Sequence, residues 1–253
     1  MVSSSTSPKV LCITGAGISA ESGIPTFRGE EGYWREGSTV FTPMEMATFG
    51  MFKRNPARVW NWYLMRLEIC RKAFPNAAHD HLVHLQHMLN DRLTLVTQNV
   101  DGLHERSGFH RARLYEIHGN IEWMRCSSPS CSHRVQHAEQ PPQAFNKDAF
   151  LCPTCGTLMR PHVLWFDEYY NEEQYRASSA AMAAAEADVL VVCGTSGSTS
   201  LPIQLAEIGL QNGARLIDIN PERNPFSGLA ERFGEFWQVS ASQGLERLLQ
   251  QIQ

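Results

Sequence analysis

Short apolar runs alternate with longer amphipathic segments along most of the chain. The runs at residues 10–13 and 189–192 are wholly apolar and predict strands buried on both faces of a parallel sheet. Further strands are predicted at residues 93–96, 114–117, 215–219 and 236–239. Segments with helical spacing separate most of these runs. Because strands that alternate with helices build a layered sheet, the pattern predicts an α/β fold with a doubly wound parallel sheet.

The helical segments carry start and stop signals. Thr42, followed by a proline and with Glu45 at the third position, predicts a capping box at the start of a helix. A second helix starts at Asn55-Pro56 and ends near residue 75. Further helices are predicted at residues 79–90, 172–187 and 201–212 and from residue 244 onward.

A glycine turn follows the first predicted strand directly. Residues 15–17 read Gly-Ala-Gly and lead into residues 18–22, a helix-competent piece that Gly23 ends. Such a turn lets the backbone approach a phosphate, and a helix N-terminus adds free N–H groups. Ala20 stands where the usual dinucleotide fingerprint has its third glycine, and no strand ending in an acid follows about 20 residues later. The turn therefore indicates a nucleotide site that departs from that fingerprint.

Polar side chains follow three of the predicted strands. They are Asn99 and Asp101, then His118, then Asn220 and Glu222. The carboxyl ends of parallel strands meet at one edge of a sheet, where ligands bind, so we expect these residues near a common site. The alternative is that Asn99 and Asp101 cap a turn and that His118 is a structural residue with both ring nitrogens satisfied.

Four cysteines have the spacing of a zinc ribbon. Cys126 and Cys131 have four residues between them, Cys152 and Cys155 have two, and 20 residues separate the pairs. Four thiolates fill a tetrahedral zinc and leave no open position for water, so the predicted site is structural. His133 or His137 is the alternative ligand in place of Cys131.

Composition limits the class of protein. The chain has 253 residues, 43% hydrophobic and 19% charged, which is typical of a globular protein with one large core or a core and a small module. A net charge of −4 does not favour nucleic acid as a partner, and no apolar stretch reaches the ~18 residues of a membrane span. The start of the chain lacks an export or transit pattern, and seven cysteines, an odd number, favour a reducing compartment. We therefore expect a cytoplasmic monomer without a membrane or nucleic-acid partner.

Several strings together resemble one family over nearly the whole chain. They are GAGISAESGIPTFRG at 15–29, TQNVDGLHERSG at 97–108, EIHGN at 116–120, the paired cysteines, RPHVLWFDE at 160–168, GTS at 194–196 and INPE at 219–222. In this combination the chain resembles the sirtuins, which are NAD-dependent protein deacylases. The resemblance implies a Rossmann-like NAD-binding domain at 1–34, 91–120 and 160–253. It also implies a small domain made of a helical module at 35–90 and the zinc ribbon at 121–159.

The resemblance also implies roles for individual residues. His118 is implied as the general base, which takes a proton from a ribose hydroxyl after the acyl oxygen has attacked the ribose C1′ and nicotinamide has left. The products are the free lysine and 2′-O-acyl-ADP-ribose. The implied NAD-binding residues are Gly15, Ala16, Gly17, Glu21, Phe27, Arg28, Trp34, Gln98, Asn99, Val100, Asp101, Gly194, Thr195, Ser196, Asn220, Pro221, Glu222 and Ala241. The implied substrate-binding residues are Tyr63, Arg66, Val163, Trp165 and Phe166.

Tyr63 and Arg66 bear on which acyl group is removed. They lie three residues apart, and Tyr-x-x-Arg here resembles the class III sirtuins, which remove succinyl and malonyl groups; Thr26, Tyr33 and Trp34 fit the same class. A guanidinium can hold the distal carboxylate of such a group bidentately. The alternative is an arginine whose stem covers apolar surface with its head in water. Two rival functions are a mono-ADP-ribosyltransferase that uses the same NAD site and a zinc-ribbon module that binds nucleic acid or protein.

Overall fold

Six parallel strands form the large sheet of this computed structural model, which describes residues 7–25, 34–36 and 39–252. The strands are β1 (Val10–Thr14), β4 (Leu93–Thr97), β5 (Leu114–Glu116), β9 (Val189–Cys193), β10 (Arg215–Ile219) and β11 (Gly234–Trp237). Their spatial order is β11-β10-β9-β1-β4-β5, so β1 lies between β4 and β9. Every residue of β1 and β4 is buried, as continuous apolar runs require. The predicted parallel sheet is confirmed.

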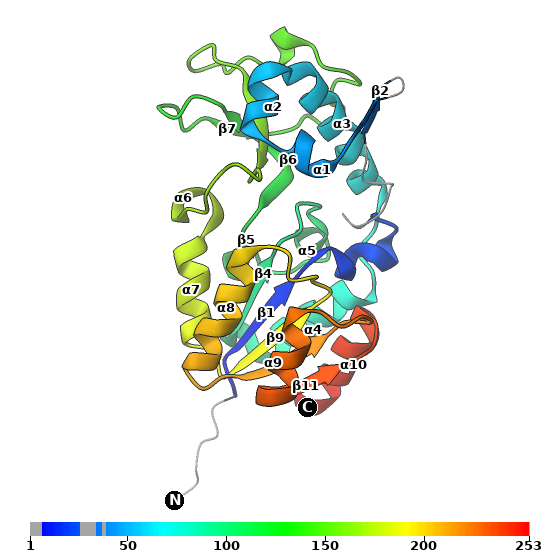
Figure 1. The fold of residues 1–253 in the computed structure, drawn as a ribbon, viewed down its shortest axis with the longest axis vertical. Helices are drawn as coiled ribbons and strands as arrows, with labels where there is room; N and C mark the ends of the chain where they lie inside the picture. Colours follow the sequence, from blue (N-terminus) through cyan, green and yellow to red (C-terminus); the bar gives the residue numbers. More distant parts are fainter. Residues whose placement is uncertain (1–6, 26–33, 37–38, 253) are drawn as a thin grey trace, which may run out of the picture.

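Helices cover both faces of this sheet (Figure 1). On one face α4 (Ala77–Leu89) and α10 (Ala241–Ile252) share a core with alternate residues of β1 and β4. On the other face lie α7 (Ala177–Ala185), α8 (Ser200–Gln211) and α9 (Pro225–Phe233). The chain changes faces between the β1–β4 and β9–β10 crossovers. The carboxyl ends of β1 and β9 are therefore the topological switch point, where doubly wound sheets bind ligands.

A second, smaller layer contains helices and an antiparallel sheet (Figure 1). Its elements are α1 (Pro43–Met46), α2 (Phe49–Arg54), α3 (Pro56–Lys72), β6 (Gly119–Cys126), β7 (Arg134–Gln136) and β8 (Met159–Val163), with β6 between β7 and β8. Three buried tryptophans, Trp60, Trp62 and Trp165, belong to its hydrophobic core. The capping box at α1 is confirmed, because Thr42 and Glu45 exchange hydrogen bonds between side chain and backbone. A short pair, β2 (Trp34–Glu36) and β3 (Thr39–Phe41), precedes α1.

Several elements differ from their sequence predictions. The segment 172–187 is two helices, α6 (Glu172–Tyr175) and α7, because Arg176 has a left-handed backbone with φ of 52°. The piece after the glycine turn is a 3₁₀ helix, η1 (Ala16–Ser22), which Gly23 ends at φ 78°. Helix α4 shares the core of the large sheet, whereas α1, α2 and α3 belong to the smaller layer. By packing, the helical part of the smaller layer therefore ends with α3.

Two of the connections between the layers lie side by side. Residues 117 and 118 lead from β5 into β6, and residues 164–171 lead from β8 to α6. The two connections touch, since Leu164 N donates to the His118 carbonyl at 2.9 Å. Gly119 follows with φ of 82°, and a Cβ there would lie 2.1 Å from the His162 carbonyl oxygen, so only glycine fits. His118 is therefore held at the junction of the layers. Within the described residues no helix has both the length and the apolarity needed to cross a bilayer.

Candidate functional site

The glycine turn after β1 packs directly against the turn after β9. Gly15 N donates to the Cys193 carbonyl at 3.1 Å, and Gly17 N donates to the Gly194 carbonyl at 2.8 Å. A Cβ on Gly17 would lie 2.7 Å from that carbonyl oxygen, and Gly194 itself has φ of 62°. In the sequence, these glycines predict room for a phosphate. In the structure, they also allow the backbones of the two turns to pack closely against each other. The predicted residues Gly15, Gly17 and Gly194 thus form one crossing at the switch point.

Gln98 links the ends of β1, β4 and β9. Its Nε2 donates to Thr195 Oγ1 at 2.8 Å and to the Thr14 carbonyl at 3.2 Å. Its Oε1 accepts from Thr199 Oγ1 at 2.9 Å. Because both ends of the amide are bonded, the side chain has one fixed orientation and the backbone of residue 98 is held with it.

Asn99 and Asp101 meet at a serine of η1. Ser19 Oγ donates to Asp101 Oδ2 at 2.7 Å and accepts from Asn99 Nδ2 at 3.1 Å. Leu103 N donates to the other carboxylate oxygen of Asp101 at 2.9 Å, and Ser19, Asn99 and Asp101 are all buried. The two polar residues predicted to face the same way do so, with Val100 between them. A buried carboxylate and amide with fixed positions suit recognition of another amide.

The His118 imidazole has a defined tautomer. Nδ1 lies 3.0 Å from the Gln98 carbonyl oxygen, which can only accept, so Nδ1 carries the proton and donates. Nε2 then carries the lone pair, and it lies 2.8 Å from the Tyr170 hydroxyl. Burial lowers the pKa of His118 to about 4, so the ring is neutral near pH 7. A neutral imidazole with its lone pair on Nε2 can accept a proton there.

The remaining polar positions predicted for NAD lie around the same edge. Asn220 Nδ2 donates to the Thr195 carbonyl at 2.9 Å, and Asn220 Oδ1 accepts from Glu222 N at 3.3 Å. Glu21 Oε1 accepts from Ser242 Oγ at 2.9 Å, at the start of α10, beside the predicted Ala241. Other members of the predicted set have local contacts: Ser196 Oγ with Ser198 Oγ at 2.7 Å, and the Pro221 carbonyl with Gln238 Nε2 at 3.2 Å.

Three predicted NAD contacts cannot be placed in this site. Phe27 and Arg28 lie outside the described residues, as do Thr26 and Tyr33. The backbone of Trp34 begins β2, and its side chain is outside the description. Their assignment therefore stays a prediction.

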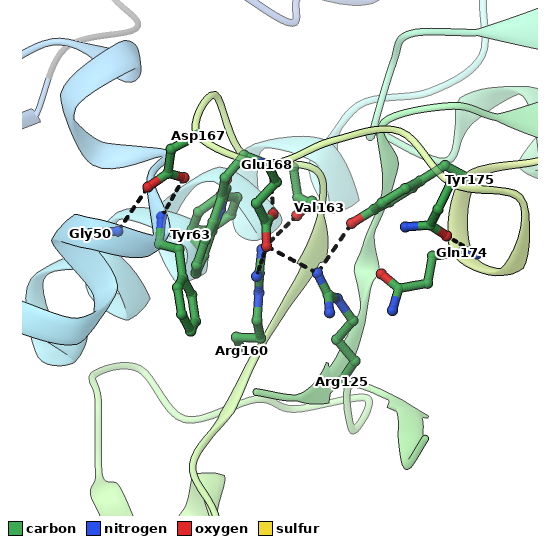
Figure 2. A network of polar contacts seen from close by, with 12 residues as sticks. Gly50, Tyr63, Arg125, Arg160, Val163, Asp167, Glu168, Gln174 and Tyr175 are labelled. Carbon is green, nitrogen blue, oxygen red and sulfur yellow. Dashed lines mark hydrogen bonds and ion pairs between the residues drawn. The ribbon is translucent and has the colours of Figure 1, made fainter. Parts of the chain in front are cut away.

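The segment after β8 is anchored by a buried ion pair (Figure 2). Arg160, 1% exposed, donates from Nη2 to Glu168 Oε2 at 2.8 Å and to the Val163 carbonyl at 2.9 Å. Its guanidinium lies 3.4 Å from the centre of the Trp165 ring. Of the three implied substrate-binding residues in this segment, Val163 and Trp165 are buried, and only Phe166 has an exposed side chain.

Asp167 ties this segment to the helices of the smaller layer (Figure 2). Its two carboxylate oxygens accept from Phe49 N at 2.7 Å and Gly50 N at 2.9 Å, at the start of α2. A carboxylate suits the free N–H groups of a helix N-terminus. Phe166 N donates to the Ala47 carbonyl at 3.0 Å. The segment thus has contacts with both the zinc-ribbon side and the helical side of its layer.

Tyr63 and Arg66 lie in the interior beside this segment. Trp165 Nε1 donates to the Tyr63 hydroxyl at 2.9 Å, and burial raises the pKa of that phenol. Arg66 is only 8% exposed, and its guanidinium lies 5.3 Å from the centre of the Trp62 ring. The alternative of an arginine with its head in water is therefore wrong.

The four cysteines form one cluster whose sulfur atoms all lie within 4.8 Å of one another. Cys126 and Cys155 sulfurs are 3.4 Å apart, and Cys131 and Cys152 sulfurs are 3.8 Å apart. Tetrahedral zinc with bonds of about 2.3 Å separates its sulfur ligands by roughly 3.8 Å. The geometry fits zinc and includes Cys131. His137, one of the two alternative ligands, instead packs edge-on against Trp60.

A buried histidine pair behind the glycine turn has no recognisable motif in the sequence. His104 Nε2 lies 3.0 Å from Thr14 Oγ1, and its ring centre lies 4.9 Å from that of His79. Burial lowers the pKa of both rings. Next to His79, Asn76 Nδ2 donates to the Ile18 carbonyl at 2.8 Å and so holds η1. Ser19, Tyr170 and Thr199 were also missed, since isolated hydroxyl residues carry no motif.

Known proteins match the chain over most of its length. The Sir2 family model matches residues 15–200. An NAD-dependent protein deacylase of Leptospira interrogans is 44% identical over 229 residues, covering 89% of this chain and 86% of that protein. One of Thermus thermophilus is 42% identical, covering 88% and 83%. The crystal structure of a Sir2 homologue with NAD has a TM-score of 0.84 at 34% identity, covering 97% and 90% of the two chains. The chain belongs to the Sir2 family.

Proposed function

We propose that this protein is an NAD-dependent protein-lysine deacylase that releases nicotinamide and 2′-O-acyl-ADP-ribose. Relatives at 37–44% identity are named NAD-dependent protein deacylases. Solved Sir2 homologues at 34% identity are complexes with NAD and with 2′-O-acetyl ADP-ribose, the acetyl form of the proposed product. The family and the edge of the sheet together support this activity.

The geometry of His118 supports the proposal most directly. A general base has to be unprotonated at the working pH and oriented toward its proton donor. Burial keeps His118 neutral, and the bond from Nδ1 to the Gln98 carbonyl leaves the lone pair on Nε2. Its position after β5, at the carboxyl edge of the large sheet and the junction of the two layers, suits a base that acts between cosubstrate and peptide.

The other residues bind and orient. NAD as cosubstrate supplies a leaving group, nicotinamide, and the ribose hydroxyls. Asn99 and Asp101, fixed through Ser19, suit the nicotinamide carboxamide. The amide of Asn220 and the hydroxyls of Thr195 and Ser196, at the same edge, suit phosphate and ribose oxygens, so the residues present fit NAD. Phe166, exposed on an anchored segment, would contact the peptide that carries the acyl-lysine.

Acidic acyl groups are the proposed preferred substrates, with acetyl also accepted. The Arg66 guanidinium is buried beside Tyr63, whose hydroxyl accepts from Trp165 and retains its own proton to donate. The planar fork of a guanidinium matches the distal carboxylate of a succinyl or malonyl group.

The zinc site has a structural role in this proposal. Four thiolates hold one zinc and leave no open position, so the metal stabilises the smaller layer and takes no part in the chemistry. None of the seven cysteines is in a disulfide, which supports a reducing compartment such as the cytoplasm. We keep a monomer as the proposed state in solution.

One experiment tests the proposed function. The protein is incubated with NAD and succinyl-, malonyl- or acetyl-lysine peptides, and nicotinamide and the peptide mass are followed together. Loss of the acyl mass with equimolar nicotinamide is expected. Gain of an ADP-ribose mass would instead identify an ADP-ribosyltransferase. Failure to bind NAD in calorimetry would return the zinc-ribbon binding module to consideration.

A further inference from the structure

Tyr170 contacts the one nitrogen of His118 that can accept a proton. Its hydroxyl lies 2.8 Å from Nε2, and the two rings stack with centres 5.8 Å apart. The residues are 52 positions apart, on the two connections that touch between the layers. Tyr170 is partly buried, and burial raises its pKa to about 12, so the phenol keeps its proton near neutral pH.

The direction of this hydrogen bond follows from the tautomer. Nδ1 donates to the Gln98 carbonyl, so the neutral ring has no proton on Nε2. The Tyr170 hydroxyl therefore donates to Nε2, and its oxygen keeps lone pairs for another donor. A proton that reaches His118 arrives at Nε2, the atom that Tyr170 covers. The proton either passes through the Tyr170 hydroxyl or reaches Nε2 only after the Tyr170 side chain has moved away.

We propose that Tyr170 is a further catalytic residue that donates to His118 Nε2 and relays a proton from the ribose hydroxyl to it. This inference rests on the proposed function. In the relay, a ribose O–H bond breaks as a new O–H bond forms on Tyr170, while the original Tyr170 O–H bond breaks as an N–H bond forms on His118. The ribose oxygen keeps its electron pair and becomes the nucleophile. Tyr170 ends neutral, and His118 ends as the cation.

Two further side chains, the hydroxyl of Thr199 and the amide of Gln98, belong to the same network as Tyr170 and His118. Thr199 lies close enough to Tyr170 to lower the pKa of the phenol and also donates to Gln98 Oε1. Gln98 in turn presents the carbonyl that holds His118. The base, the relay and the group that orients the base therefore form one continuous network.

Tyr170→Phe removes the hydroxyl and keeps the ring. Positioned proton transfer contributes ~10²- to 10⁴-fold, and water can replace part of a lost relay, so kcat for deacylation should fall at least about tenfold. Exchange of labelled nicotinamide into NAD precedes base action, so it should stay within about twofold of wild type, as should both KM values. Tyr169→Phe is the matched control, because that neighbouring side chain is 90% exposed.

A titration of the enzyme without NAD gives a second readout. Hydrogen bonding to the neutral ring disfavours the cation, so its loss in Tyr170→Phe should raise the His118 pKa by roughly half a unit to one unit. The ¹⁵N shifts of the imidazole report this pKa and the tautomer. In contrast, the Tyr169→Phe titration should match wild type.

Each outcome decides between the alternatives. Unchanged or increased kcat in Tyr170→Phe would overturn the relay and make the tyrosine a group that blocks the base. Equal losses of exchange and deacylation, or an unchanged His118 titration, would also overturn the inference. Absence of acyl-dependent nicotinamide release in the wild type would instead refute the proposed function, so the two failures are distinguishable.

Discussion

Glu168→Gln tests whether the ion pair with Arg160 holds the segment that follows β8. The carboxylate accepts from both Nη atoms of Arg160 and, at 2.9 Å, from Trp165 N (Figure 2). The side chain of Arg160 is 2% exposed and that of Glu168 is 21% exposed. Burial lowers the pKa of Arg160, and the bond to Glu168 opposes that shift. The bond to Glu168 therefore compensates the buried charge of Arg160.

The size of the effect follows from this burial. Removing one member of a buried ion pair costs ~3–5 kcal/mol, because the other charge is left uncompensated. Glu168 is partly exposed, so we expect the lower value, about 3 kcal/mol. At ~2–4 °C per kcal/mol for a chain of this size, Tm should fall by about 6–12 °C. The anchored segment should also loosen, so KM for the peptide should rise while NAD affinity stays unchanged.

Thermal unfolding and peptide kinetics measure both effects. Glu173→Gln is the matched control, since Glu173 is exposed in the same part of the chain. A Tm for Glu168→Gln within about 1 °C of the Glu173→Gln variant would refute the reasoning. An equal change in NAD and peptide affinity would show that the segment is not specific to the peptide side.

Three other predictions use different observations. Arg66→Met should reduce kcat/KM for desuccinylation at least about tenfold and largely spare deacetylation, because a charge-assisted bond contributes ~1.5–3 kcal/mol; equal losses would make Arg66 structural. Zinc analysis should find one zinc per chain, with Cys152→Ser losing it and unfolding the smaller layer; unchanged metal content would contradict the four-thiolate site. Stability in urea should fall as pH drops from about 7.5 to 5.5. His104, His118 and His162 have folded pKa values below the usual histidine value, so the unfolded state binds more protons than the folded state in that range. The free energy of unfolding should therefore fall by ~1 kcal/mol per histidine for each pH unit. Constant stability at constant zinc content would show that these rings titrate normally.

The large sheet and the four-cysteine cluster could be predicted from the sequence for simple reasons. A strand covered on both faces needs a continuous apolar run, which Val10–Thr14 and Leu93–Thr97 supply. Parallel strands bring their carboxyl ends together, so the sequence alone predicts Asn99 and His118 at one edge of the sheet. The cysteine cluster could be predicted because two closely spaced cysteine pairs are the usual way in which a chain supplies four ligands to a tetrahedral metal.

Other features depend on contacts between distant residues, which local patterns do not record. The Tyr170–His118 bond joins residues 52 positions apart, and the Ser19–Asp101 bond joins residues 82 apart. The left-handed backbone at Arg176 breaks a segment whose alanine-rich composition favours one helix. A long arginine stem is compatible with water or with burial, so the position of Arg66 required the packing around it.

His118→Ala, assayed with NAD and a succinyl-lysine peptide, tests the central claim most directly. The variant should fold, keep its zinc, bind NAD and exchange nicotinamide, yet form no detectable 2′-O-acyl-ADP-ribose, because its base is missing. His110→Ala, at an exposed histidine, should match the wild type. Retention of more than about a tenth of wild-type deacylation by His118→Ala would contradict the assignment of His118 as the base.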